Sequence, residues 1–173
     1  MVAPRLEINL EKIHDNAQEL VSRLSQQGIS VTAVTKATLG SAEIVSALIR
    51  AGISSLGDSR IETIKALRLM GHHVLTTDVP MVLIRSPMLS QAADVVMYAD
   101  MSCNTEVEVI KKLSSEAQKQ GCVHEVLLMV ELGDLREGIM PDDLIDTVRE
   151  VLQLPNILPV SYTHLRAHET QPY

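Results

Sequence analysis

Segments with strand character alternate with segments of helical character along most of this chain. Five short segments have the composition or placement of strands, at 29–36, 53–57, 81–85, 101–104 and 124–132. The longer segments between them repeat apolar residues at helical spacing. Because short connections between alternating strands and helices require parallel strands with right-handed crossovers, this order predicts an α/β fold.

Helices are expected before the first strand and after each strand. One helix is predicted over 9–27 and another over 87–100. Ser59 and Glu62 have the spacing of a capping box, which predicts that a helix begins there. Pro141 stands where the first residue of a further helix belongs. The segment "NILPV" after that helix indicates the start of a sixth strand.

Two architectures fit this order of elements, an open doubly wound sheet and a (β/α)8 barrel. The first strand is followed by "KATLGS" and not by a G-x-G-x-x-G turn, so a dinucleotide-binding fold is disfavoured. A complete barrel takes about 250 residues, so this chain supplies roughly five and a half of the eight units. The prediction is an incomplete (β/α)8 TIM-type barrel with an N-terminal helix, forming one partial barrel domain over residues 1–158.

The final segment, 159–173, differs from the rest of the chain. It holds two of the three tyrosines and shows neither strand nor helix periodicity. The string "SYTHLRAHET" resembles translated adaptor or vector sequence, and we therefore predict that 159–173 is a non-native tail and exclude it from the fold. A natural disordered C-terminus is the alternative. On the first interpretation, the natural protein continues differently after residue 158.

Charge and composition restrict the class of partner. The net charge of −7 argues against binding to nucleic acid or to an anionic membrane. No apolar run approaches the roughly 20 residues that a membrane span needs. The two cysteines, Cys103 and Cys122, have no metal-type spacing, which favours a cytoplasmic protein without a metal site.

Lys36 ends the first predicted strand. In a barrel, the chemistry takes place at the C-terminal ends of the strands. A partly buried lysine loses some of its preference for the charged form, so that its amine can act as a nucleophile or a base. A solvated loop lysine is the ordinary alternative at such a position, and spacing alone leaves both open.

Several segments together resemble one enzyme family. "PRLEINLEKIHDNAQEL" is similar to the opening of fold-type III pyridoxal-phosphate enzymes. In this chain Ile8, Leu10, Ile13 and Asn16 match the residue pattern of that opening. "AVTKA" resembles their first strand. "AGISSLGDSRIETIKAL", "LIRSPML", "ADMSCNTEVEVIKKLSSEA" and "LMVELGDLREGI" are most similar to the ornithine racemase-type branch of the alanine racemase-like family. The resemblance extends over about residues 4 to 158.

The resemblance implies a cofactor and roles for individual residues. Lys36 matches the lysine that forms the internal aldimine with pyridoxal 5′-phosphate and acts as one of two bases in racemising an amino acid. Arg136 matches an arginine that hydrogen-bonds the phenolic oxygen of the cofactor, which suits an always-charged guanidinium. Arg85, at the end of the third strand, is a candidate contact to substrate or cofactor. Asp58 is interpreted as a helix cap or an ion partner and not as a catalytic acid.

The resemblance also implies parts that residues 1–158 lack. In this family the second base comes from a C-terminal domain, often of the partner subunit, and phosphate-binding loops come from the last strands. The expectation is therefore a homodimer when full length, and a truncated, inactive fragment as written. Two departures disfavour alanine as the substrate: "KATLG" has no tyrosine, and Met129 stands where many alanine racemases have a carbamylated lysine.

Two rival functions share the same barrel. A non-catalytic pyridoxal-phosphate-binding homeostasis protein also carries a lysine at the end of strand one, and "AGISSLGDSRIE" resembles its second strand and helix. An aldolase or dehydratase of this fold type would need metal ligands outside residues 1–158. The natural continuation after residue 158 would distinguish the racemase from the homeostasis protein, because the racemase requires a second domain and the homeostasis protein only the rest of the barrel.

Overall fold

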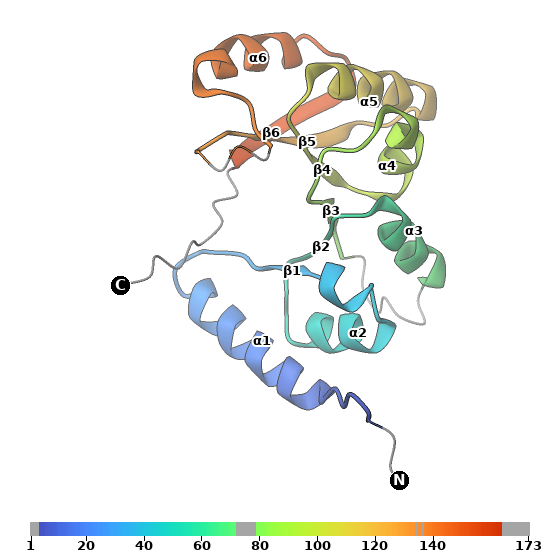
Figure 1. Cartoon of the computed structure of the whole chain (residues 1–173), viewed down its shortest axis with the longest axis vertical. Coiled ribbons are helices and arrows are strands. Elements are labelled where there is room, and N and C mark those ends of the chain that lie inside the picture. Colours follow the sequence, from blue (N-terminus) through green and yellow to red (C-terminus); the bar gives the residue numbers. More distant parts are fainter. Residues whose placement is uncertain (1–3, 72–78, 134, 136, 164–173) are drawn as a thin grey trace.

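The backbone forms one curved parallel sheet. The computed structural model describes residues 4–71, 79–133, 135 and 137–163. Six strands lie side by side in the order of the sequence, and each is parallel to its neighbours (Figure 1). The strands are β1 (Thr32–Val34), β2 (Ser55–Asp58), β3 (Met81–Leu83), β4 (Met101–Asn104), β5 (His124–Met129) and β6 (Ile157–Thr163).

Helices precede and follow the strands as predicted. They are α1 (Leu10–Ser25), α2 (Ala42–Arg50), α3 (Ile61–Met70), α4 (Ala92–Tyr98), α5 (Val107–Gln120) and α6 (Leu144–Val151). Single 3₁₀ turns occur as η1 (Lys36–Thr38), η3 (Leu89–Gln91) and η4 (Pro141–Asp143). Among the residues described, no helix is both long and apolar enough to cross a membrane.

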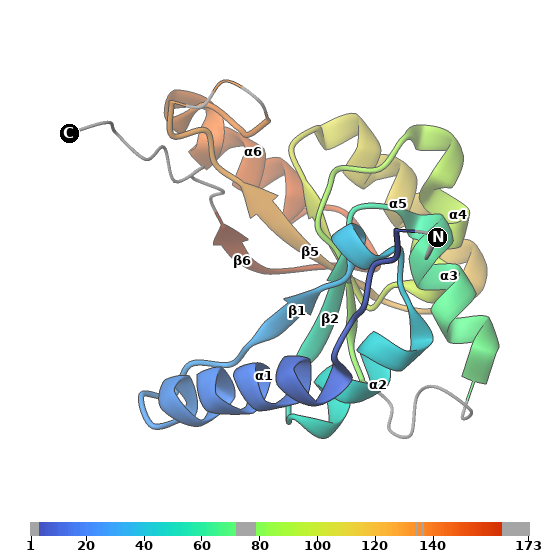
Figure 2. The ribbon, with the colours of Figure 1, turned by 60° about the horizontal axis from the view of Figure 1, so that its bottom comes forward.

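The strand order decides between the two predicted architectures. A doubly wound sheet reverses its strand order at a switch point and carries helices on both faces. Here the order is strictly sequential, and α2 to α6 follow one another around the outside of the curved sheet (Figure 2). This is the arrangement of a (β/α)8 barrel, of which the described residues contain six strands. The prediction of a partial barrel with an N-terminal helix is confirmed.

The core lies between the sheet and its helices. Alternate strand residues face outward and pack against the helices, as Leu56, Met81 and Val126 do. Their partners on α3 and α5 include Ile64 and Leu113, and all five side chains are buried. Burying a large aliphatic side chain contributes roughly 1.5–3 kcal/mol, so this layer supplies most of the stability of the described part.

The inner face of the sheet is only partly covered. Cys103 and Met129 on this face are buried, whereas Val34 on β1 is 47% exposed. β1 and β6 are the two edges of the sheet and are not paired with each other in the described residues (Figure 2). The concave face is therefore open beside β1.

Several local predictions need correction. Strand β1 is shorter than 29–36, because Thr35 takes helical backbone angles and Lys36 begins η1. The predicted capping box is wrong: α3 begins after Arg60, and no side chain caps it. Glu62 Oε1 instead accepts a hydrogen bond from Gln91 Nε2 at 2.9 Å. The segment 87–100 divides into η3 and α4.

Strand β6 extends beyond the predicted domain limit. It begins at Ile157, as "NILPV" indicated, and its backbone continues to Thr163 beside β5. The start of the segment 159–173 thus belongs to the sheet, with a register shift opposite Val126 and Leu127. Backbone pairing is open to almost any sequence, so the non-native origin of 159–173 stays a prediction.

Candidate functional site

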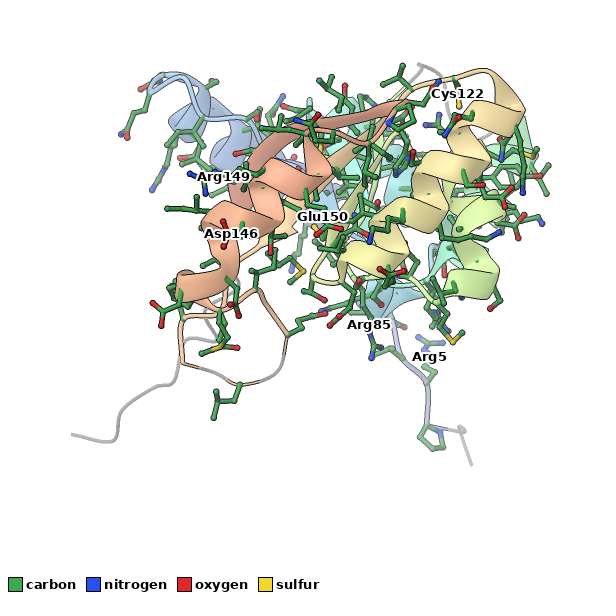
Figure 3. The ribbon with its side chains drawn as sticks, turned by 90° about the horizontal axis from the view of Figure 1, so that it is seen from above. Arg5, Arg85, Cys122, Asp146, Arg149 and Glu150 are labelled. Atoms are coloured by element: carbon green, nitrogen blue, oxygen red, sulfur yellow. The ribbon has the colours of Figure 1, made fainter. Side chains whose placement is uncertain are left out.

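The C-terminal ends of the strands bring two of the predicted site residues, Lys36 and Arg85, to one end of the barrel. Lys36 follows β1 by two residues, and Arg85 follows β3 by two. Both side chains are exposed, which differs from the partly buried lysine that the sequence suggested. The cause is the open inner face beside β1. Figure 3 shows Arg85 at the opposite end of the molecule from Cys122, which precedes β5.

The turn that carries Lys36 is fixed by the residue before it. Thr35 is 1% exposed, and its amide donates to Gly57 O of β2 at 2.9 Å. Its carbonyl oxygen accepts from Thr38 N and from Thr38 Oγ1, both at 3.0 Å. A further bond comes from Gly40 N at 3.4 Å. The backbone on both sides of Lys36 is thus held, although its side chain is exposed.

Asp58 lies at the end of β2 beside this turn. Its carboxylate is 1% exposed and accepts a hydrogen bond from Thr35 Oγ1 at 2.8 Å and another from Arg60 N at 3.0 Å. Its carbonyl oxygen accepts from Ile84 N at 3.0 Å. The bond from Arg60 N links Asp58 to the residue that precedes α3, although Asp58 caps no amide of the helix itself. No ion pair of Asp58 occurs within the described residues, so the ion-partner alternative has no support there.

Arg85 continues β3 toward the same end of the barrel. It makes no ion pair with any residue that the structure describes. The next residue, Ser86, has a buried hydroxyl that lacks a hydrogen-bond partner among those residues. Arg136, the other predicted cofactor contact, lies outside the described residues, so the structure leaves its role as a prediction.

A buried carboxylate organises the loop between β5 and η4. Glu131 Oε1 accepts hydrogen bonds from the backbone N–H of Gly133 and, at 3.1 Å, of Leu135. Glu131 N donates to Ile139 O at 2.9 Å, and Ile139 N donates to Met129 O at 2.7 Å. This loop lines a pocket of about 360 Å³ beside the ends of β4 and β5. Its lining residues are Thr105, Glu106, Glu131, Leu135, Glu137, Gly138 and Met140.

Sequence reasoning missed this pocket. The available signal was a glutamate near the end of the predicted strand 124–132, followed by two glycines in "VELGDLREG"; the strand in fact ends at Met129, so Glu131 lies in the loop. Burial raises the pKa of the Cys103 thiol on β4 to about 11, and the negative charge of Glu137 makes a smaller contribution in the same direction. Cys103 is therefore a neutral thiol at physiological pH and unsuited to act as a nucleophile.

A second pocket, of about 440 Å³, lies at the other end of the strands. One of its lining residues is His124, which is 2% exposed and shares a hydrogen bond of 2.9 Å between Nε2 and Ser102 Oγ. Burial lowers the pKa of His124 to about 4, although the negative charge of Asp100 opposes this shift. In barrels this end supports stability and not chemistry.

Comparisons with known proteins agree with this geometry. The family model described as "Alanine racemase, N-terminal domain" matches residues 8–172. The ornithine racemase of Acetoanaerobium sticklandii is 34% identical over 155 residues, covering 89% of this chain and 42% of that protein. The lysine racemase of Thermotoga maritima is 33% identical over 150 residues, covering 87% and 41%. The chain thus spans about two fifths of these curated relatives.

Solved structures show the same fold at lower identity. The alanine racemase of Clostridium difficile superposes with a TM-score of 0.77 at 18% identity, covering 92% of this chain and 40% of that one. The PipY protein of Synechococcus elongatus with pyridoxal phosphate bound gives 0.74 at 19% identity, covering 88% and 72%. At these identities the likeness concerns the barrel alone.

Proposed function

The chain belongs to the alanine racemase N-terminal domain family, and from this premise we propose that it is the cofactor-binding barrel of an amino-acid racemase. Pyridoxal 5′-phosphate is the proposed cofactor, and Lys36 is its proposed point of attachment. The observation that carries the proposal is the position of Lys36, an exposed amine on a hydrogen-bonded turn at the C-terminal end of β1. The curated relatives, both named as racemases, support the same reaction class.

The side chains at this end of the barrel fit the cofactor. The aldehyde of pyridoxal phosphate reacts with an amine that is not held in an ion pair. Lys36 forms no ion pair with the described residues. Anionic phosphate and phenolate groups need cations, and Arg85 is exposed at the same end of the strands. Arg136, which lies outside the described residues, is the second proposed cation.

The chemistry follows from what each group can do. Pyridoxal phosphate, when bound, supplies an electron sink that lowers the cost of removing the α-proton of an amino acid. Lys36 Nζ is the proposed base that takes this proton on one face and holds it. Racemisation also needs an acid on the opposite face, which we propose to lie outside residues 1–158. Ornithine and lysine are the proposed substrates, and a homodimer is the proposed full-length assembly.

Cofactor attachment is tested first with the chain as it stands. Pyridoxal phosphate added to the protein is expected to give a visible absorption band of bound cofactor. Lys36→Ala and Lys36→Arg should lower that band at least tenfold, because neither side chain offers the reacting amine. Lys12→Arg is the matched control, since Lys12 is an exposed lysine on the outer helix α1 and not at the end of a strand. Equal bands in all four proteins would refute Lys36 as the attachment point.

Racemisation is tested separately, on the full product of the source gene. The proposal expects optical rotation to decay in solutions of L-ornithine or L-lysine, and to decay more slowly with L-alanine. A protein that holds the cofactor on Lys36 but leaves all three amino acids unchanged would instead favour the non-catalytic cofactor-binding protein.

A further inference from the structure

Thr35, the residue before Lys36, forms a buried pair with Asp58. Thr35 Oγ1 donates to Asp58 Oδ2 at 2.8 Å, and its longer contact, to Gly57 O, is 3.3 Å. Both residues are 1% exposed. A buried carboxylate is costly unless hydrogen bonds compensate it, so its presence at this point of the fold calls for a reason.

The pair joins three strand ends to the turn that carries Lys36. The Asp58 carboxylate contacts Thr35 at the end of β1, while the Asp58 carbonyl oxygen accepts from Ile84 at the end of β3. Through its own carbonyl oxygen, Thr35 holds Thr38 and Gly40 of the turn. Every polar group of Thr35 is therefore engaged, and the backbone that leads into Lys36 is tied to β2.

The shape of the turn makes this anchoring necessary. Leu39 and Gly40 both have left-handed backbone angles, with φ of 54° and 67°. A non-glycine residue rarely adopts such angles unless the surrounding contacts impose them. The hydrogen bonds to Thr35 O hold the turn in this conformation from its N-terminal side.

From these contacts we propose that Thr35 and Asp58 are positioning residues, whose hydrogen bond fixes the base of Lys36 so that its amine meets the cofactor aldehyde. The inference rests on the proposed function, because it concerns the same lysine. The pair itself is expected to touch neither substrate nor cofactor. Since reactive groups must be held within a fraction of an ångström, losing the anchor should slow attachment without removing the amine.

The test compares variants that remove or keep the hydroxyl–carboxylate bond. In Thr35→Val the shape is kept and the hydroxyl lost, whereas Thr35→Ser keeps the hydroxyl. The rate at which bound cofactor forms should fall about tenfold in Thr35→Val and in Asp58→Ala, and Thr35→Ser should stay within about twofold of the parent. The double variant should be no slower than the slower single one, because both substitutions remove the same interaction.

Ser102→Ala is the matched control. It also removes a buried hydroxyl from the helix-facing side of the sheet, but on β4, where Ser102 contacts His124 and Asn104. It should lower stability without slowing attachment. If Thr35→Val and Asp58→Ala attach the cofactor at the parental rate, or if Ser102→Ala slows it equally, the positioning role is wrong.

A cofactor-free measurement separates this inference from the proposed function. Amide hydrogen exchange at Thr38 and Gly40, both donors to Thr35 O, should accelerate at least tenfold in Thr35→Val and Asp58→Ala and not in Ser102→Ala. If the parent protein fails to attach the cofactor at all, the proposed function falls. Unchanged exchange in the two variants would overturn the anchoring by Thr35 and Asp58, whatever the cofactor does.

Discussion

Replacing Gly138 by alanine is expected to lower the free energy of unfolding by about 3 kcal/mol, by combining backbone strain with overpacking. Gly138 has φ +145°, a conformation that L-residues rarely adopt. An added Cβ would lie 2.7 Å from Glu131 Cα and 2.8 Å from Val130 C, which are backbone atoms that cannot rotate away. Relief would require moving the loop off β5 and breaking the hydrogen bonds from Glu131 N to Ile139 O and from Ile139 N to Met129 O.

Gly121→Ala is the matched control for this substitution. Gly121 ends α5 with φ +68°, and an added Cβ would meet nothing within 4 Å. Its replacement should cost only about 1 kcal/mol, from the left-handed backbone alone. Urea denaturation of both variants measures the difference. If Gly138→Ala is no less stable than Gly121→Ala, the loop does not close on Glu131 as described.

Acidification from pH 6.5 to pH 4 is expected to remove about 3 kcal/mol of stability through His124. Burial lowers the pKa of His124 in the folded chain to about 4, whereas a histidine in the unfolded chain titrates near 6.5. Between these values the unfolded state binds a proton that the folded state does not. Stability is therefore intact above pH 6.5 and falls progressively as the pH approaches 4.

His124→Gln isolates this effect from the titration of carboxylates. Glutamine does not titrate, and its amide can still hydrogen-bond Ser102 Oγ. Unfolding free energies of both proteins, measured by urea denaturation across this pH range, should converge as the pH falls, because only the parent loses the His124 contribution. Parallel curves would show that His124 protonates in the folded state as readily as in the unfolded one.

The order of elements and the place of Lys36 were predictable because they depend on local patterns. Apolar periodicity marked each helix and strand, and alternation with short connections implied parallel pairing. A strand ending in a lysine then placed Lys36 at the end of the barrel where chemistry occurs. The alternation of residues along β5 also predicts that His124 faces the helices, because it lies on the same side of the strand as Val126 and Leu128.

The details of the site depend on contacts between distant parts of the chain. Thr35 and Asp58 are 23 residues apart, and no local pattern pairs a threonine with that carboxylate. The same holds for Glu131. Its carboxylate accepts hydrogen bonds from the backbone N–H groups of Gly133 and Leu135, in a loop whose sequence has no periodicity that would predict them. The capping box failed for a similar reason, because Gln91 from a later turn binds Glu62 and Asp58 takes the amide of Arg60.

The most direct test of the proposed function is to locate the cofactor on the chain. The protein is mixed with pyridoxal phosphate, reduced with borohydride to make any imine permanent, digested, and mapped by mass spectrometry. We expect the peptide containing Lys36 to carry the label, while the peptides of Lys12, Lys65 and Lys111 stay at background. Label on another lysine, or label spread evenly over all of them, would contradict the assignment of Lys36.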